Sequence, residues 1–189
     1  MLQAQRIRKE IGVPKDAFLI VSVGELNKNK NHQVIVKAVA KIQNKSIHYV
    51  IAGKGDQKKI LEQLSLELKI DEQVHLIGYQ EDISLLYHAA DLCAFPSIRE
   101  GLGLAALEGM TCGLPLICSN NRGSKSYATN DNAIMCNADS PKDFAKAIIT
   151  LINNPELCSK MGKNGKKTTE EYSIDYVNEL MKKIYFKYL

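Results

Sequence analysis

The chain has 189 residues, of which 45% are hydrophobic and 24% charged, a composition typical of a globular protein that can bury one large core. The formal net charge of +4 is spread along the sequence, and no basic run is long enough to predict a nucleic-acid-binding groove. No segment has the length and apolar character of a membrane span or a secretory signal, so we expect a cytoplasmic location.

Strand-like and helix-like segments alternate along the chain. Pro141 and Pro155 fall near expected helix starts, where proline is tolerated. Asp82 is expected to cap a helix and Gly113 to end one. In chain order we expect a strand at 18–24, a helix at 31–42, a strand at 47–55, a helix at 58–70, a strand at 73–78, a helix at 82–90, a strand at 91–97, a helix at 101–113, strands at 114–119 and 133–136, and three helices after residue 140.

These segments predict an α/β fold. The strand runs are apolar throughout, which indicates burial on both faces. Regular alternation with helices then favours a Rossmann-like, doubly wound parallel sheet of about six strands flanked by helices. We expect a single domain over residues 1–189 with its core at 18–153. Because ligands bind beyond the carboxyl ends of the strands in such folds, the loops of interest follow Gly24, Gly53, Gly78, Phe95 and Ser119.

The cysteines favour a reducing compartment. They are odd in number and show no C-x-x-C spacing, which argues against a disulfide framework and a zinc site. Most lie in apolar runs, where cysteine packs as a small hydrophobic residue. The five are Cys93, Cys112, Cys118, Cys136 and Cys158.

Two loops after expected strands carry glycine or lysine. In VGELNKNKNH (23–32), Lys28 and Lys30 precede a helix and can reach an anion at this edge, although a solvated loop is an equal alternative. In AGKGD (52–56), the glycines permit a close approach of the backbone to a ligand or form a tight turn. Neither loop is a G-x-G-x-x-G fingerprint or a G-x-x-x-x-G-K-[ST] phosphate loop.

The segment REGLGLAALEGMTCGLPLIC (99–118) has the strongest functional pattern. Gly101 and Gly103 follow a strand where a helix begins, so free amides and the positive helix end predict an anion site. We expect Glu108 to be buried and to accept hydrogen bonds from two vicinal hydroxyls, with Glu100 facing a second polyol. The alternative, a solvated Glu100 and a Glu108 paired with a lysine, leaves the glycines unexplained.

This segment resembles the E-x7-E signature of the large retaining glycosyltransferase family with the GT-B fold, group 4. SVGELNKNKNH, VIAGKGD, VHLIGYQEDISLLYHAADLCAFPS and DFAKAIITLINNP are similar to further parts of the family, in order. The resemblance runs from about residue 18 to the carboxyl terminus. It is similar to the bacterial members that build capsular, exopolysaccharide or cell-surface glycans.

The resemblance implies a role for each matching position in binding a nucleotide sugar. Glu108 holds the ribose hydroxyls and Glu100 contacts the donor sugar. Lys30 neutralises the departing diphosphate, so Lys30 and Glu100 are the expected catalytic residues. The expected donor-binding residues are Gly24, Lys28, Gly53, Gly78, Tyr79, Gln80, Gly101, Leu102, Gly103, Leu104 and Glu108, with the amides of residues 101–104 facing the diphosphate and sugar and residues 78–80 along the base.

Two features depart from the family. Glu25 stands where the family commonly has a second diphosphate-binding arginine, so either Lys28 substitutes or Glu25 turns away. GT-B enzymes also have two Rossmann-like domains, and only the second, donor-binding half is matched. The amino-terminal half is therefore expected as a missing domain or a separate partner chain.

The implied function is transfer of a sugar from a nucleotide sugar, with UDP as the expected nucleotide, to a hydroxyl acceptor with retention of anomeric configuration. No divalent metal or other cofactor is implied, and the isolated half is expected to bind without transferring. The full enzyme is expected to associate peripherally with the inner face of the membrane. Two alternatives remain: a non-catalytic nucleotide-sugar-binding module, and a GT-B-like sugar epimerase.

The last segment, 172–189, has apolar residues at helical spacing with lysines between them. Core packing, docking on the missing half and binding to a membrane surface are three open interpretations. The apolar positions are Ile174, Val177, Leu180, Met181, Ile184, Tyr185 and Tyr188.

Overall fold

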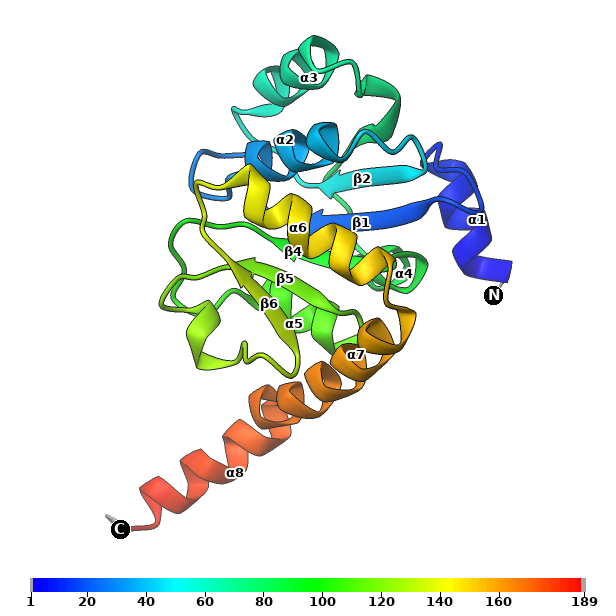
Figure 1. Cartoon of the computed structure of the whole chain (residues 1–189). Helices are drawn as coiled ribbons and strands as arrows, with labels where there is room; N and C mark the ends of the chain where they lie inside the picture. Colours follow the sequence, from blue (N-terminus) through cyan, green and yellow to red (C-terminus); the bar gives the residue numbers. More distant parts are fainter. Residues whose placement is uncertain (1, 188–189) are drawn as a thin grey trace.

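Six short apolar strands pair into one sheet in the computed structural model, which describes residues 2–187. All pairings are parallel, in the order β3-β2-β1-β4-β5-β6 (Figure 1). The predicted doubly wound sheet is therefore confirmed. The strands are β1 (Phe18–Val23), β2 (Ile47–Ala52), β3 (Val74–Gly78), β4 (Leu92–Phe95), β5 (Leu116–Ser119) and β6 (Ala133–Cys136).

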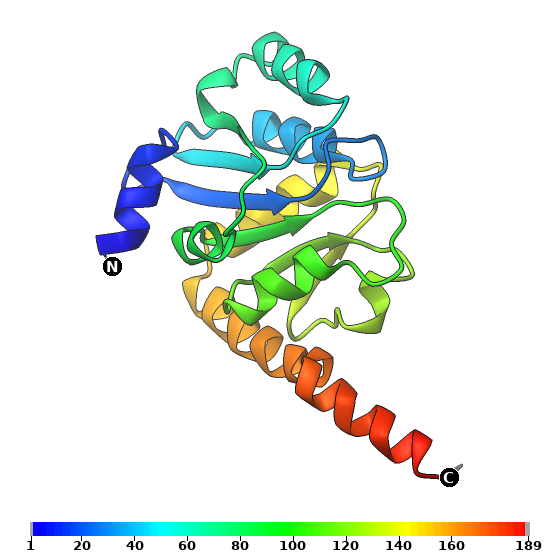
Figure 2. The ribbon, with the colours of Figure 1, turned by 180° about the vertical axis from the view of Figure 1, so that it is seen from behind.

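Helices cover both faces of this sheet, as Figures 1 and 2 show from opposite sides. Three short 3-10 turns complete the chain: η1 (Asp71–Gln73), η2 (Ser124–Ser126) and η3 (Glu170–Tyr172). The helices are α1 (Leu2–Glu10), α2 (His32–Ile42), α3 (Lys58–Glu67), α4 (Ser84–Ala89), α5 (Leu104–Thr111), α6 (Pro141–Ile152), α7 (Pro155–Thr169) and α8 (Ile174–Tyr185).

The core consists of two hydrophobic clusters, one on each face of the sheet. Ile20 and Tyr49 pack with residues of α2, α3 and α6. Leu19, Val21 and Val50, which alternate with them along β1 and β2, pack with residues of α4 and α5 on the opposite face. This arrangement explains why the strands are mostly apolar on both faces, without a regular alternation of apolar and polar residues.

The helix ends follow the expected local chemistry. The side chain of Ser140 accepts a hydrogen bond from the third residue of α6, and Pro141 occupies the first position. Asp82 accepts from both the amide and the hydroxyl of Ser84, the first residue of α4. Gly113, at φ +79°, ends α5 in the left-handed conformation that glycine tolerates.

The structure differs from the expected elements most clearly at α5 and at α1. Helix α5 begins at Leu104 rather than at residue 101, so Gly101 and Gly103 lie in the preceding loop instead of weakening a helix. Helix α1 was not expected. It is held by Arg8, whose guanidinium donates to the carbonyl of Ala89 and forms an ion pair with Asp91 at 2.8 Å.

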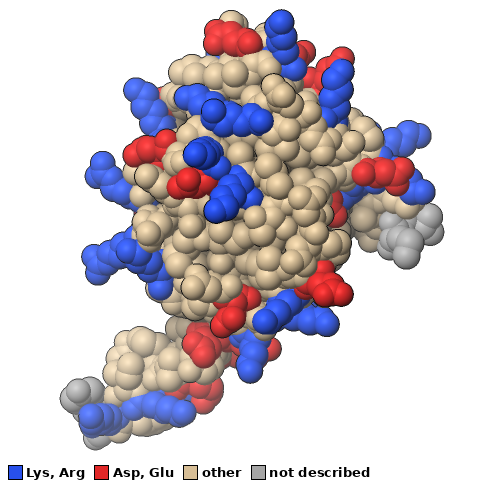
Figure 3. All heavy atoms as spheres, viewed as in Figure 1, with Lys and Arg blue, Asp and Glu red and all other residues tan. Residues whose placement is uncertain are grey.

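Helix α8 projects from the body of the molecule in both views (Figures 1 and 2). None of its residues is buried, so its interpretation as a core-packing helix is wrong. Figure 3 shows this projection at the lower left as a largely uncharged surface bordered by lysines. Tyr188 lies outside the described residues. The apolar side chains from 174 to 186 are 41% to 77% exposed: Ile174, Tyr176, Val177, Leu180, Met181, Ile184, Tyr185 and Phe186.

Within residues 2–187, no helix has the length and apolar character needed to span a bilayer.

Candidate functional site

The strand order reverses between β1 and β4. From β1 the chain builds β2 and β3 on one side, then returns to place β4, β5 and β6 on the other. Because every strand runs in the same direction, the loops after them meet at one edge, as the sequence predicted. In doubly wound sheets the crevice at this point binds ligands. The β1–α2 loop (24–31) and the β4–α5 loop (96–103) leave the sheet at this point, and the edge between these two loops is called the crevice here.

Glycine backbone forms the floor of this edge beside β1. The amide of Gly53 donates to the carbonyl of Gly78, and the amide of Gly24 donates to the carbonyl of Ala52. A Cβ atom on Gly53 would lie 1.8 Å from the carbonyl oxygen of Gly24, so no side chain fits there. The ends of β1, β2 and β3 therefore approach one another closely and leave this edge open to a ligand.

An ion pair joins the two loops across the crevice. The Nζ atom of Lys30 lies 2.5 Å from Oε1 of Glu100, and the two side chains are only 22% and 14% exposed. The same ammonium lies 5.3 Å from the centre of the Phe95 ring. Glu100 is thus not a solvated loop residue, because Lys30 supplies the donor that a half-buried carboxylate requires.

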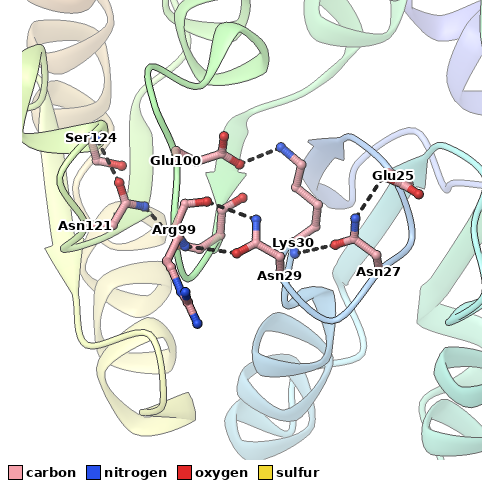
Figure 4. A network of polar contacts seen from close by, with 9 residues as sticks. Glu25, Asn27, Asn29, Lys30, Arg99, Glu100, Asn121 and Ser124 are labelled. Carbon is pink, nitrogen blue, oxygen red and sulfur yellow. Dashed lines mark hydrogen bonds and ion pairs between the residues drawn. The ribbon is translucent and has the colours of Figure 1, made fainter.

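Side-chain amides reinforce this junction, as Figure 4 shows. Asn29 donates to the carbonyl of Arg99 at 2.9 Å and accepts from the amide of Arg99 at 3.1 Å. On the other side of the same loop, Asn121 donates to the carbonyl of Ser97. Neither asparagine was identified from the sequence, although both lie in loops that were expected to matter.

The amino end of α5 opens beside Glu100. Gly103 precedes the helix at φ +91°, and a Cβ atom there would lie 2.7 Å from the Phe95 ring. Gly101 has no neighbour within 4 Å of its Cβ position. The first amides of an α-helix have no acceptor within the helix, so the amides of Leu104 and the residues before it are suited to bind an anion.

A pocket of about 410 Å³ lies at the ends of β1, β2 and β3. Tyr79 is 65% exposed on its wall, and the Nζ atom of Lys54 lies 5.6 Å from the centre of the Tyr79 ring. The side-chain amide of Gln80 donates to the carbonyl of Ile77, so Gln80 presents its backbone to a ligand in this pocket. Lys54 was missed by the sequence analysis because one lysine in a glycine turn gives no signal.

Glu108 is exposed, which corrects the expectation of a buried carboxylate. It lies between two hollows. One, of about 310 Å³, is lined by Ser84 and Tyr87 of α4, and the other, of about 360 Å³, by Lys166 of α7. The first hollow adjoins the Tyr79 pocket, since both are lined by residues 81 and 83. Glu108 can therefore meet a ligand that extends from that pocket towards the amino end of α5.

Two predicted residues lie apart from the Lys30–Glu100 pair. Lys28 lines a separate hollow of about 100 Å³ together with Gln33 and Gln57. Glu25 lines the Tyr79 pocket, and its carboxylate accepts a hydrogen bond from Asn27 at 2.8 Å (Figure 4).

A buried hydrogen-bond chain supports the crevice from below. The Ser22 hydroxyl donates to the carbonyl of Ala94, and the Tyr49 hydroxyl donates to Ser22. Each hydroxyl has one proton, so Nδ1 of His32 must donate to Tyr49 across 3.1 Å. Burial lowers the pKa of His32 to about 4, so the imidazole is neutral at pH 7.

Among residues 2–187, no three histidine, cysteine, aspartate or glutamate side chains are grouped closely enough to hold a metal ion.

Comparison with known proteins identifies a family. Residues 3–168 match the family model described as "Glycosyl transferases group 1". EpsD of Bacillus subtilis (strain 168) is 35% identical over 191 residues, which cover 100% of this chain and 50% of EpsD. The lipopolysaccharide core biosynthesis glycosyltransferase LpsD of Rhizobium meliloti (strain 1021) is 30% identical over 162 residues, which cover 85% of this chain and 47% of LpsD.

The fold matches solved structures of glycosyltransferases. HepE of Anabaena, crystallised with UDP-glucose, superposes with a TM-score of 0.91 at 21% identity, over 98% of this chain and 53% of HepE. The chain thus spans about half the length of the relatives it matches.

Proposed function

This chain belongs to the group 1 glycosyltransferases, and we propose that it forms the half of such an enzyme that binds the nucleotide-sugar donor. The observation that carries this proposal is the Lys30–Glu100 pair at the point where the strand order reverses. It places a cation for a diphosphate and a carboxylate for sugar hydroxyls side by side. The open amino end of α5 lies next to both.

The proposed donor lies along one path over this edge. The base occupies the pocket of Tyr79 and Gln80, and the ribose hydroxyls bond Glu108. The diphosphate meets Lys30 and the amides of residues 101–104, and the sugar contacts Glu100. We propose uridine as the nucleoside, since HepE, whose fold this chain shares, was crystallised with UDP and with UDP-glucose.

In the proposed reaction the sugar is transferred to a hydroxyl acceptor with retention of configuration. Negative charge develops on the departing diphosphate, and the α5 amides together with the Lys30 ammonium stabilise it. These groups provide the stabilisation without a divalent metal. Glu25 cannot supply the positive charge of an arginine, so the reaction relies on Lys30 alone among the two lysines of its loop, because Lys28 lies in a separate hollow.

We further propose that the other half of the enzyme contributes the acceptor site and docks on α8. The relatives are about twice as long as this chain, and α8 presents an apolar face with no partner among residues 2–187. The acceptor belongs to a surface or extracellular polysaccharide, a proposal supported by the name of LpsD. Alone, the chain is expected to bind donor without transferring sugar.

Calorimetric titration of this chain with UDP and GDP, on wild type and on Glu108→Ala, tests the proposal. We expect UDP binding in the wild type and a loss of at least about tenfold in the variant, as for a carboxylate that bonds two hydroxyls. Tighter binding of GDP would overturn the choice of base. Failure of both nucleotides to bind would overturn the donor-binding role.

A further inference from the structure

We infer that Asn29 is a positioning residue, which holds Glu100 against Lys30 and so couples binding of the sugar to binding of the diphosphate. This inference rests on the proposed donor site. Asn29 lies between the two lysines of the β1–α2 loop, and it neither faces the Tyr79 pocket nor carries charge.

Asn29 forms three hydrogen bonds to the neighbouring loop. Its Nδ2 atom donates to the Arg99 carbonyl at 2.9 Å, and its Oδ1 atom accepts from the Arg99 amide at 3.1 Å. Its own carbonyl accepts from the amide of Ile98 at 2.8 Å. A single residue of one loop thus bonds two consecutive residues of the other, which fixes both the separation and the relative orientation of the two backbones.

The Asn29–Arg99 contact sets the distance between the Cα atoms of Lys30 and Glu100. Asn29 directly precedes Lys30, and Arg99 directly precedes Glu100. When residues 29 and 99 are joined, residues 30 and 100 start from adjacent backbone positions, and Figure 4 shows their side chains meeting above the joined backbones. Without the Asn29 side chain, the two loops keep the bond from the Ile98 amide to the residue-29 carbonyl, a longer bond of 3.4 Å from Asn31 to the carbonyl of Pro96, and the ion pair itself.

Two further hydrogen bonds, made by Asn27 and Asn121, hold each loop independently of Asn29. The amide of Lys30 donates to Oδ1 of Asn27, which holds the lysine's own backbone. Asn121 donates to the carbonyl of Ser97, which attaches the Glu100 loop to the loop after β5. Neither asparagine bridges the two charged residues. Asn29 is therefore the side chain whose loss separates them while each loop keeps its own support.

Calorimetry with UDP and UDP-glucose on Asn29→Ala tests the inference. We expect UDP affinity to stay the same or to rise, as in Glu100→Gln, and UDP-glucose affinity to fall by about fivefold relative to that of UDP, the effect of losing roughly one hydrogen bond's net contribution. A loss of stability alone would not change the ratio of the two affinities. Asn44→Ala is the matched control, since Asn44 bonds the backbone amide of Ser46 far from the crevice. An unchanged ratio of the UDP and UDP-glucose affinities would overturn the inference.

A second measurement does not depend on nucleotide binding. Limiting acetylation followed by mass spectrometry gives the reactivity of Lys30 relative to Lys28. We expect Asn29→Ala to raise this ratio at least twofold, towards the value in Glu100→Gln, where the partner carboxylate is absent. An unchanged ratio would overturn the positioning role. If the wild type binds neither UDP nor UDP-glucose, the proposed function fails, and the acetylation ratio still decides whether Asn29 holds the pair.

Discussion

Lys30 and Glu100 are 70 residues apart in the sequence, yet their charged atoms lie 2.5 Å apart across the boundary between β1 and β4. In the proposed donor site both groups have another task, because Lys30 meets the diphosphate and Glu100 meets the sugar. A bare nucleotide therefore competes with Glu100 for the Lys30 ammonium.

We predict that Glu100→Gln strengthens the binding of UDP. Removal of the carboxylate leaves the ammonium free for the diphosphate, and a partly exposed charge pair of this kind is worth up to about 1 kcal/mol, or roughly a fivefold gain in affinity. Lys30→Met should weaken UDP binding by about tenfold. Calorimetry at low and high salt checks both effects, which salt should diminish. Glu62→Gln, which removes the carboxylate of an exposed ion pair with Lys58 on α3, is the control. Weaker UDP binding by Glu100→Gln would contradict the competition.

We predict that Glu108 distinguishes ribose from deoxyribose. The wild type should bind UDP about tenfold more tightly than 2′-deoxy-UDP, because each charge-assisted hydrogen bond contributes about 1.5–3 kcal/mol. In Glu108→Ala the two affinities should become nearly equal. Competition titrations measure the ratio, with Glu170→Ala as the control because Glu170 lines the same hollow. Retention of the tenfold preference in Glu108→Ala would place the ribose elsewhere.

We predict that alanine destabilises the fold at Gly103 but not at the nearby Gly101. Gly103→Ala should destabilise the fold by at least about 2 kcal/mol, because a Cβ atom would lie 2.7 Å from the Phe95 ring and the residue has φ +91°. Gly101→Ala meets no atom within 4 Å and should change the stability by less than about 0.5 kcal/mol. Urea denaturation measures the free energy of unfolding of both variants. Equal losses at the two positions would contradict the predicted clash at Gly103.

We predict that His32 makes stability fall between pH 6.5 and pH 4. The folded-state pKa of about 4 lies below the usual 6.5, so the unfolded chain binds more protons in this range and stability rises with pH. The full shift corresponds to about 3 kcal/mol, all of it present above pH 6.5. The difference in unfolding free energy between wild type and His32→Gln, measured from pH 7 to pH 4.5, should therefore shrink as the pH falls. A difference that stays constant from pH 7 to pH 4.5 would contradict this role of His32.

We predict that α8 contributes little to the stability of this chain. Val177→Asp with Met181→Asp should shift the melting temperature by less than about 2 °C, since both side chains are more than 40% exposed. The same pair of changes should prevent docking of the amino-terminal half, measured by ultracentrifugation of the two halves mixed. A chain truncated after residue 173, which lacks α8, is the matched comparison for both the melting temperature and the docking. A drop in melting temperature of 5 °C or more would show that α8 packs on the body.

The sequence predicted the sheet well because its strands are buried on both faces and the first three end at a glycine or directly before one. Helix α1 was missed because few of its residues are apolar. It is held instead by Arg8, which donates to the carbonyl of Ala89 and pairs with the carboxylate of Asp91, both more than 80 residues away. The burial of Glu108 was misjudged from its apolar sequence neighbours. On the short helix α5 it shares a face with Leu104 and Thr111, four residues before and three after, and both of these are exposed.

The residues of the candidate site divide in the same way. Lys30, Glu100 and the glycines could be identified because charge and glycine at a strand end are local signals. Asn29 and Asn121 could not, since their importance depends on which loops lie side by side, and that is set by the order of the strands.

The seam between β1 and β4 has a consequence for folding. Strand β1 pairs with β2 along its whole length but with β4 only at Ile20–Leu92 and Val21–Cys93. Joining β4 to β1 closes a loop of about 70 residues, whose entropy cost delays long-range pairing. The crevice lies on this seam, so an intermediate that retains only β1 to β3 has the Tyr79 pocket and Lys30, and one that retains only β4 to β6 has Glu100, Glu108 and the α5 amides. Nucleotide binding would therefore begin only when the two halves of the sheet have joined.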